Sequence, residues 1–319
     1  MRDRVLFSFR GEEAGPTLVI VTAMHGNEPA GVEGALRLAR RLESAGGVVG
    51  GEVVALVGHR AALAQGRRFL DRDLNRIWRY PPGQVATLQE GRERRDLTRT
   101  LAGILRRARG PVRVFDIHTT SGLGPPYTVV GDSDWGRITA DRLPVPRVLG
   151  LARRISGTLS GWLDRQGIGN LVLEAGAHTD PASPRRTEEI LRLTLSLMGI
   201  VGSKEIEVPE AEEALLRRCR HLPPLLELVH RHPVRPGDRF EMQPGYENLA
   251  PIREGEVLAH DRRGPVRSPL TGWILMPLYQ LQGEDGFFVV VPARRYPEDG
   301  PLEPARRGDA FQSAGDGIA

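Results

Sequence analysis

The chain has 319 residues, of which 40% are hydrophobic and 26% charged, as is usual for a globular protein. Its formal charge of 44 − 40 = +4 is too small an excess to indicate nucleic-acid binding. The single cysteine, Cys219, excludes an intrachain disulfide, and no apolar run has the length of a signal peptide or a membrane span. We therefore expect a soluble protein of the cytoplasm.

The first part of the chain alternates apolar strands with a helix. We expect an edge strand at residues 5–9 and buried strands at 18–22 and 53–57. A helix is expected to begin at Pro29, whose missing N–H costs nothing in a first turn, and to stop before Gly46. The order strand, helix, strand predicts a mostly parallel α/β sheet flanked by helices.

The middle of the chain continues this alternation after an Arg-rich stretch at residues 60–78. Further elements are predicted as strands at 112–117 and 170–173, and helices at 84–109, mainly 145–166, and 187–198. The Arg residues of the 84–109 segment are interleaved with acidic residues, which is typical of a solvated helix face.

Composition changes near Gly202, and from about residue 229 short strands alternate with Pro-Gly and Glu-Gly turns. This pattern predicts a smaller C-terminal β-domain. We expect a catalytic domain at residues 1–203, the β-domain at 204–297, and a disordered tail at 298–319, which consists largely of Gly, Ala, Pro and charged residues.

Three predicted strands end in groups that bind metals or transfer protons: His25 with Glu28, then His118, then Glu174. Two histidines and one carboxylate form the ligand set of zinc hydrolases that keep a coordination position open for water. A second carboxylate is then needed as the base, and Glu174 follows an apolar run that would raise its pKa. The alternative is that Glu174 is a helix-start carboxylate. Asp116, two residues before His118, would either orient that histidine or cap a neighbouring turn.

The Arg-rich stretch contains two acidic residues, Asp71 and Asp73. They could pair with Arg67 and Arg72 on the surface. The remaining guanidinium groups would then need an external anion, such as a substrate carboxylate.

These residues fall into four motifs, which we quote in chain order: His25-Gly26-Asn27-Glu28, Asp73-Leu74-Asn75-Arg76, Asp116-Ile117-His118-Thr119-Thr120-Ser121 and Leu173-Glu174-Ala175-Gly176. Together they resemble the succinylglutamate desuccinylase/aspartoacylase family, a branch of the zinc-carboxypeptidase superfamily. The resemblance is strong over residues 18–200 and extends loosely to a C-terminal β-domain. It implies one zinc ion per chain, held by His25, Glu28 and His118, with Glu174 as general base and acid.

The resemblance also implies roles in substrate binding. Arg68 matches the family's arginine that polarises the scissile carbonyl, and Asn75 and Arg76 match the pair that holds the substrate carboxylate. For a further substrate arginine the nearest match is Arg165, with Arg153 and Arg154 as alternatives. Tyr279 could be an aromatic residue that reaches the ligand from the β-domain, or the apolar residues around it could simply be that domain's core.

We therefore expect a zinc-dependent amidohydrolase that cleaves the linear amide of a small, carboxylate-bearing N-acyl amino acid. A carboxypeptidase or esterase using the same site is the nearer alternative, and a non-catalytic anion-binding protein the more distant one. No nucleic-acid or membrane partner is expected. Assembly into a homo-oligomer is left open.

Overall fold

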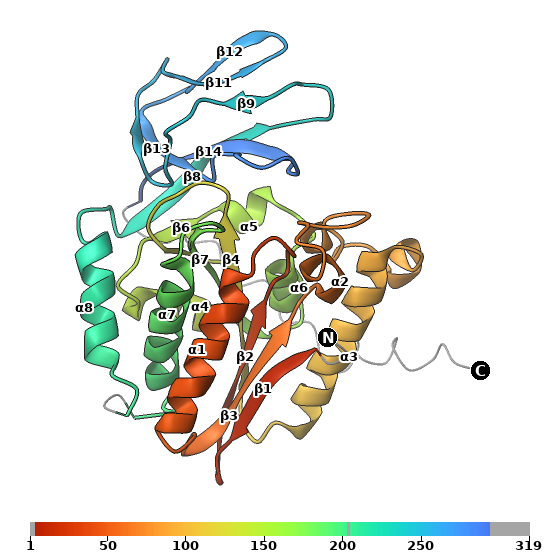
Figure 1. Cartoon of the computed structure of the whole chain (residues 1–319), viewed down its shortest axis with the longest axis vertical. Coiled ribbons are helices and arrows are strands. Elements are labelled where there is room, and N and C mark those ends of the chain that lie inside the picture. Colours follow the sequence, from red (N-terminus) through yellow and green to blue (C-terminus); the bar gives the residue numbers. More distant parts are fainter. Residues whose placement is uncertain (1–3, 203–204, 294–319) are drawn as a thin grey trace.

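The computed structural model describes residues 4–202 and 205–293 (Figure 1). The predicted tail at 298–319 lies outside these ranges. An 11-stranded sheet runs through the molecule in the order β1-β3-β2-β4-β7-β5-β6-β8-β14-β13-β10, and a second sheet has the order β12-β11-β9. The strands are β1 Val5–Arg10, β2 Glu13–Thr22, β3 Gly50–Val57, β4 Val112–Thr120, β5 Tyr127–Val129, β6 Arg147–Leu149, β7 Gly169–Ala177, β8 Leu225–Pro233, β9 Glu241–Met242, β10 Pro251–Ile252, β11 Val257–Asp261, β12 Gly264–Arg267, β13 Gly272–Leu275 and β14 Asp285–Pro292.

The centre of the large sheet is parallel, as predicted. Strand β2 pairs in parallel with β3 and β4, and β4 pairs in parallel with β7. Strand β1 is an antiparallel edge, and β5 runs antiparallel to β7. The mixed, mostly parallel sheet confirms the predicted fold class, and the carboxyl ends of β2, β4 and β7 therefore lie at one edge.

Helices cover both faces of this sheet. They are α1 Ala30–Ser44, α2 Arg60–Leu63, α3 Gln89–Arg107, α4 Asp134–Arg142, α5 Leu151–Arg154, α6 Leu159–Arg165, α7 Ser183–Leu197 and α8 Val208–Cys219, with 3-10 turns η1 Leu74–Arg76 and η2 Pro82–Val85. Leu18 and Ile20 of β2 pack with α1 and α7, whereas Val19 and Val21 face α3 and α6. Figure 1 shows α1, α7 and α8 side by side on one face, with α3 on the other. A strand buried on both faces explains the continuous apolar run of β2.

Helix α1, which follows the first site turn, packs closely on α7. A Cβ atom at Gly34 of α1 would lie 2.5 Å from the Cβ of Thr187 on α7. The absence of a side chain at Gly34 therefore lets the two helices approach each other, and this contact fixes the position of the turn that precedes α1.

The C-terminal part contains the predicted small β-structure. Strands β9, β11 and β12 form the separate antiparallel sheet and share a core with β10, β13 and β14. The large sheet nevertheless continues into this part, because β8 pairs in parallel with β6 and antiparallel with β14. Helix α8, which precedes β8, packs on α7.

Residues 145–166 differ from the prediction of a mainly helical segment, which was wrong. The structure has strand β6 and two short helices, α5 and α6, in this range. Gly150 and Gly157 have φ angles of 85° and 82°, in the left-handed region that a continuous right-handed helix excludes. The helix predicted at 84–109 is shorter than expected and begins at Gln89. The sequence pattern also did not indicate α2, β5, α4 or α8. Within the described residues, no helix is both long and apolar enough to cross a membrane.

Candidate metal centre and active site

The turn after β2 carries the first two candidate ligands. Ala23 has a φ of 48°, so the backbone turns sharply as soon as the strand ends. A Cβ atom at Gly26 would lie 2.1 Å from the carbonyl carbon of Ala62, and therefore only glycine fits this close approach. The turn buries the side chains of His25 and Glu28, which are 4% and 2% exposed.

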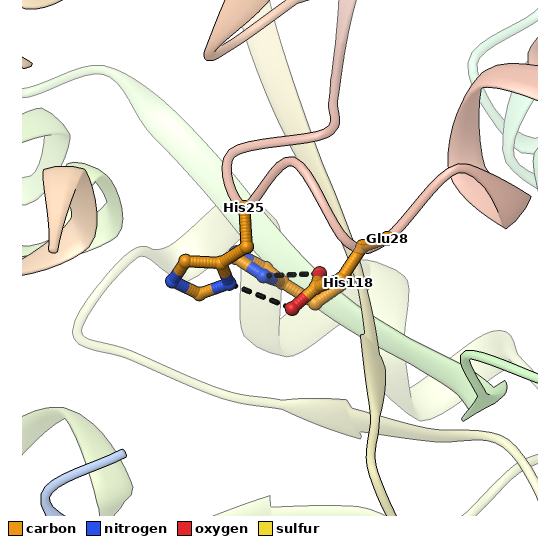
Figure 2. A group of neighbouring side chains, drawn as sticks. All are labelled: His25, Glu28 and His118. Atoms are coloured by element: carbon orange, nitrogen blue, oxygen red, sulfur yellow. Dashed lines mark hydrogen bonds and ion pairs between the residues drawn. The ribbon is translucent and has the colours of Figure 1, made fainter. Parts of the chain in front are cut away.

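The third candidate ligand, His118, lies on β4 and meets the turn from the neighbouring strand. His25 Nδ1 lies 2.7 Å from Glu28 Oε1, and His118 Nδ1 lies 3.1 Å from Glu28 Oε2 (Figure 2). One ligand atom from each residue can be chosen so that all three lie within 4.8 Å of one another. The structure thus brings together the three side chains that the sequence predicted as a metal site.

Two further carboxylates hold the outer nitrogen of each imidazole. His25 Nε2 lies 3.1 Å from Asp73 Oδ1, and His118 Nε2 lies 3.2 Å from Asp116 Oδ2. An Nε2–H that donates to a carboxylate leaves the Nδ1 lone pair free for a metal. Of the two roles weighed for Asp116, the structure shows orientation of His118. The role of Asp73 was not predicted, because its partner His25 is 48 residues away in the chain.

The donor set fits a divalent ion. Glu28 Oε2 also accepts a hydrogen bond from the Thr119 backbone N–H at 3.1 Å, which fixes the carboxylate between the two rings. Burial acts to raise the pKa of Glu28, but the imidazoles hold it well below its usual range. Burial likewise acts to lower the pKa of His118, yet Asp116 and Glu28 raise it well above normal. This cluster attracts positive charge to its centre, and two imidazoles with one carboxylate are a donor set that suits zinc.

Glu174 lies within β7, which excludes the helix-start alternative. Its register partner is His118 on β4, and on the other side it pairs with Tyr127 of β5. The residue is 6% exposed, and neither its Oε2 atom nor the hydroxyl of Tyr127 has a hydrogen-bond partner among the described residues. Burial raises the pKa of Glu174 well above its usual range. A raised pKa makes the Glu174 carboxylate a stronger base than a solvated one, which suits a group that takes up and releases a proton.

Polar groups from the Arg-rich stretch line the same pocket. Arg68 donates to Asp73 at 3.0 Å and lies 3.8 Å from Glu28, so Asp73 pairs with this residue and not with Arg67 or Arg72. Asn75 Oδ1 accepts from the backbone N–H of Leu159 at 2.8 Å, which fixes the side chain at the start of α6.

The pocket has a volume of about 930 Å³, which includes the space at its mouth that is open to solvent. His25, Glu28, His118, Glu174, Arg68, Asn75 and Arg76 all line it. The structure does not bring Arg165 or Tyr279 to this lining: Arg165 is exposed on the last turn of α6, and the Tyr279 hydroxyl donates to the Gln243 carbonyl at 2.6 Å. The alternatives Arg153 and Arg154, at the end of α5, do not line it either.

The comparison with family models decides the family of this chain. The model of the succinylglutamate desuccinylase/aspartoacylase catalytic domain matches residues 14–199, more than half of the sequence. The chain belongs to the succinylglutamate desuccinylase/aspartoacylase family. No curated protein matches it.

Solved structures of desuccinylase/aspartoacylase proteins share the fold. The ectoine utilization protein EutE (DoeB) from Ruegeria pomeroyi, solved with bound product, is 19% identical with a TM-score of 0.62, over 88% of this chain and 86% of that chain. Succinylglutamate desuccinylase from Vibrio cholerae is 18% identical with a TM-score of 0.63, over 91% and 85%. A succinylglutamate desuccinylase/aspartoacylase from Rhodobacter sphaeroides is 19% identical with a TM-score of 0.63, over 92% and 88%.

In this member of the desuccinylase/aspartoacylase family, Asp285 is a charged pocket residue that the sequence did not indicate. Asp285, the first residue of β14, faces Arg76 with a separation of 3.6 Å between Oδ2 and Nη2. Arg231 Nε donates to the other carboxylate oxygen at 2.5 Å. No local sequence pattern could indicate this pair, because Asp285 lies 285 − 76 = 209 residues after Arg76.

Proposed function

We propose that this protein is a zinc-dependent hydrolase that cleaves the amide bond of a small, carboxylate-bearing N-acyl amino acid. The observation that carries the proposal is the cluster of His25, Glu28 and His118 beside a buried, incompletely hydrogen-bonded Glu174. Membership of the desuccinylase/aspartoacylase family supports hydrolysis as the reaction.

His25 Nδ1, His118 Nδ1 and the Glu28 carboxylate would hold the ion. When bound, zinc supplies Lewis acidity that polarises a carbonyl group and lowers the pKa of water. Asp73 and Asp116 keep the two imidazoles in the tautomer that this requires, because each carboxylate accepts from an Nε2–H.

Glu174 acts as the base in this proposal. It accepts a proton from the attacking water and gives it to the leaving nitrogen, so that the amide is exchanged for a carboxylate and an amine. Arg68 donates to the carbonyl oxygen as negative charge develops there, and Asp73 holds its guanidinium at 3.0 Å. Arg76 and the Nδ2 group of Asn75 bind the substrate carboxylate.

The proposal is tested by metal analysis and turnover. We expect about one zinc ion per chain and hydrolysis of N-acyl amino acids that stops on chelation. Glu174→Gln should retain the metal and lose at least ~10²-fold in kcat, because the proton relay is gone. Retained turnover in that variant would remove the proposed base. Faster cleavage of C-terminal peptides or of esters would favour the alternative activities, and ligand-induced thermal stabilisation without turnover would indicate a binding protein.

A further inference from the structure

One side of the pocket is apolar. It is lined by Val129, Leu151, Ile155, Val172, Met276 and Phe288. These residues come from β5, α5 and the residue after it, β7, the segment after β13, and β14. All six belong to, or pack against, a single hydrophobic cluster that links the large sheet to the C-terminal strands. The wall is therefore the open edge of a packed core, which holds its shape without a ligand.

This wall begins beside the proposed base. Val172 precedes Glu174 by two residues on β7, so both side chains project from the same face of the strand. Val129 on β5 is the register partner of Val172 and extends the apolar surface to the next strand. A substrate whose scissile bond lies at Glu174 would therefore lay its neighbouring group on these valines.

The charged side chains of the pocket disfavour a second anionic group on the substrate. Among the described residues that line it, two are arginines, Arg68 and Arg76, and five are acidic: Glu28, Asp116, Glu174, Glu284 and Asp285. If a divalent cation (+2) is bound at the histidines, the two arginines (+2) and five ionised carboxylates (−5) give the pocket lining a formal charge of +2 + 2 − 5 = −1.

Both guanidinium groups are also partly committed. Arg68 is held by Asp73 at 3.0 Å and lies near Glu28. Arg76 faces Asp285 at 3.6 Å, and this carboxylate is shared with Arg231, which donates to its other oxygen at 2.5 Å, so Arg76 keeps part of its positive charge for a substrate carboxylate. The pocket can therefore serve one carboxylate at Arg76, and a second would meet acidic or apolar surface.

We propose that the substrate is a monoanion: an N-acyl amino acid whose acyl group is apolar and uncharged and lies on the Val129–Val172 wall, with Asp285 of β14 as the specificity-determining residue against dicarboxylates. This inference rests on the proposed function. It distinguishes the chain from an enzyme for acyl groups that end in a carboxylate, because a succinyl group would place its charge on apolar side chains.

The test compares matched substrates on the zinc-loaded full-length protein. N-acetyl-, N-hexanoyl- and N-succinyl-leucine vary the acyl group, and N-hexanoyl-aspartate adds a carboxylate to the amino acid. A buried methylene contributes about fourfold in binding affinity.

We therefore expect kcat/KM for the hexanoyl compound to exceed that for the succinyl compound by at least about tenfold. We also expect kcat/KM for N-hexanoyl-aspartate to be lower than that for N-hexanoyl-leucine. A preference for the succinyl group or the aspartate overturns the inference and leaves the proposed function intact, whereas hydrolysis of none of the four overturns the proposed function.

Two variants test the wall and the carboxylate separately. Val172→Thr is nearly isosteric and should lower the preference for hexanoyl over acetyl by a few fold. Asp285→Asn removes a negative charge beside Arg76 and should raise the ratio of kcat/KM for N-succinyl-leucine to that for N-hexanoyl-leucine. Glu254→Gln, which removes an exposed charge in a turn of the β-domain, should change neither this ratio nor the hexanoyl-to-acetyl ratio. Binding of hexanoate and of succinate to Glu174→Gln, measured calorimetrically, gives a readout without turnover. Tighter binding of succinate, or unchanged ratios in both variants, would refute the assignment.

Discussion

The hydrogen bond between Asp116 and His118 offers a test of the metal centre that does not depend on knowing the substrate. Asp116 Oδ2 lies 3.2 Å from His118 Nε2, and the aspartate is 1% exposed. Its other oxygen has no partner among the described residues, so Asp116→Asn keeps the shape and removes mainly the charge. Loss of such an outer carboxylate typically weakens metal binding 10–100-fold.

That factor converts into a measurable stability change. A 10–100-fold loss of affinity is about 1.4–2.7 kcal/mol. With zinc well above its Kd, the stabilisation conferred by the metal falls by the same amount. At about 2 °C per kcal/mol for a chain of this size, the zinc-dependent rise in Tm should be about 3–5 °C smaller in Asp116→Asn than in the wild type.

The assay is thermal unfolding with saturating zinc and with a chelator, because the difference between the two cancels any effect of the substitution on the metal-free protein. Asp134→Asn is the matched control, since Asp134 is exposed in the first turn of α4. Equal zinc-dependent increments in Asp116→Asn and in the control would show that Asp116 does not support a ligand. The absence of any increment in the wild type would place the metal elsewhere or nowhere.

Three further outcomes are expected for the fold. Cys219 should resist alkylation in the native protein at pH 8 and react on unfolding, because burial raises the pKa of its thiol to about 11; rapid native labelling would contradict this. Leu38→Ala should reduce the free energy of unfolding by about 2–5 kcal/mol in denaturant titration, because Leu38 is fully buried between α1 and the sheet. Glu93→Ala should cost about 3–5 kcal/mol in the same assay, since it leaves the buried guanidinium of Arg4 without its carboxylate, and a change below 1 kcal/mol would refute that pairing.

The site residues that could be predicted are those that lie at the end of a recognisable apolar strand. His25 and Glu28 follow an apolar run within one turn, and His118 and Glu174 directly follow the fourth and fifth predicted strands. Parallel pairing of β2, β4 and β7 is enough to bring these residues together, and β-strand periodicity places Asp116 on the same side as His118. For the candidate metal centre, the local sequence pattern and the strand pairing therefore predict the same arrangement of residues.

The rest depends on contacts between segments far apart in the chain. Asp73 reaches His25 from a loop that has no periodic pattern, and Asp285 reaches Arg76 from β14. Arg165 was chosen by its spacing from Glu174, but the left-handed glycines of residues 145–166 break the expected helix, and this arginine ends exposed on α6. Spacing alone does not reveal such a break.

The pairing of β6 with β8 has a consequence for how the molecule can be divided. The predicted domain boundary near residue 203 does not divide the large sheet, because β6, before the boundary, is hydrogen-bonded to β8, after it. Truncation at that point would strip β6 of a neighbour and leave an unpaired strand edge that favours self-association. Because β14 also contributes Asp285 and Phe288 to the pocket, substitutions restricted to this late strand would change the proposed acyl-group preference while the proposed metal ligands and Glu174 stay unaltered.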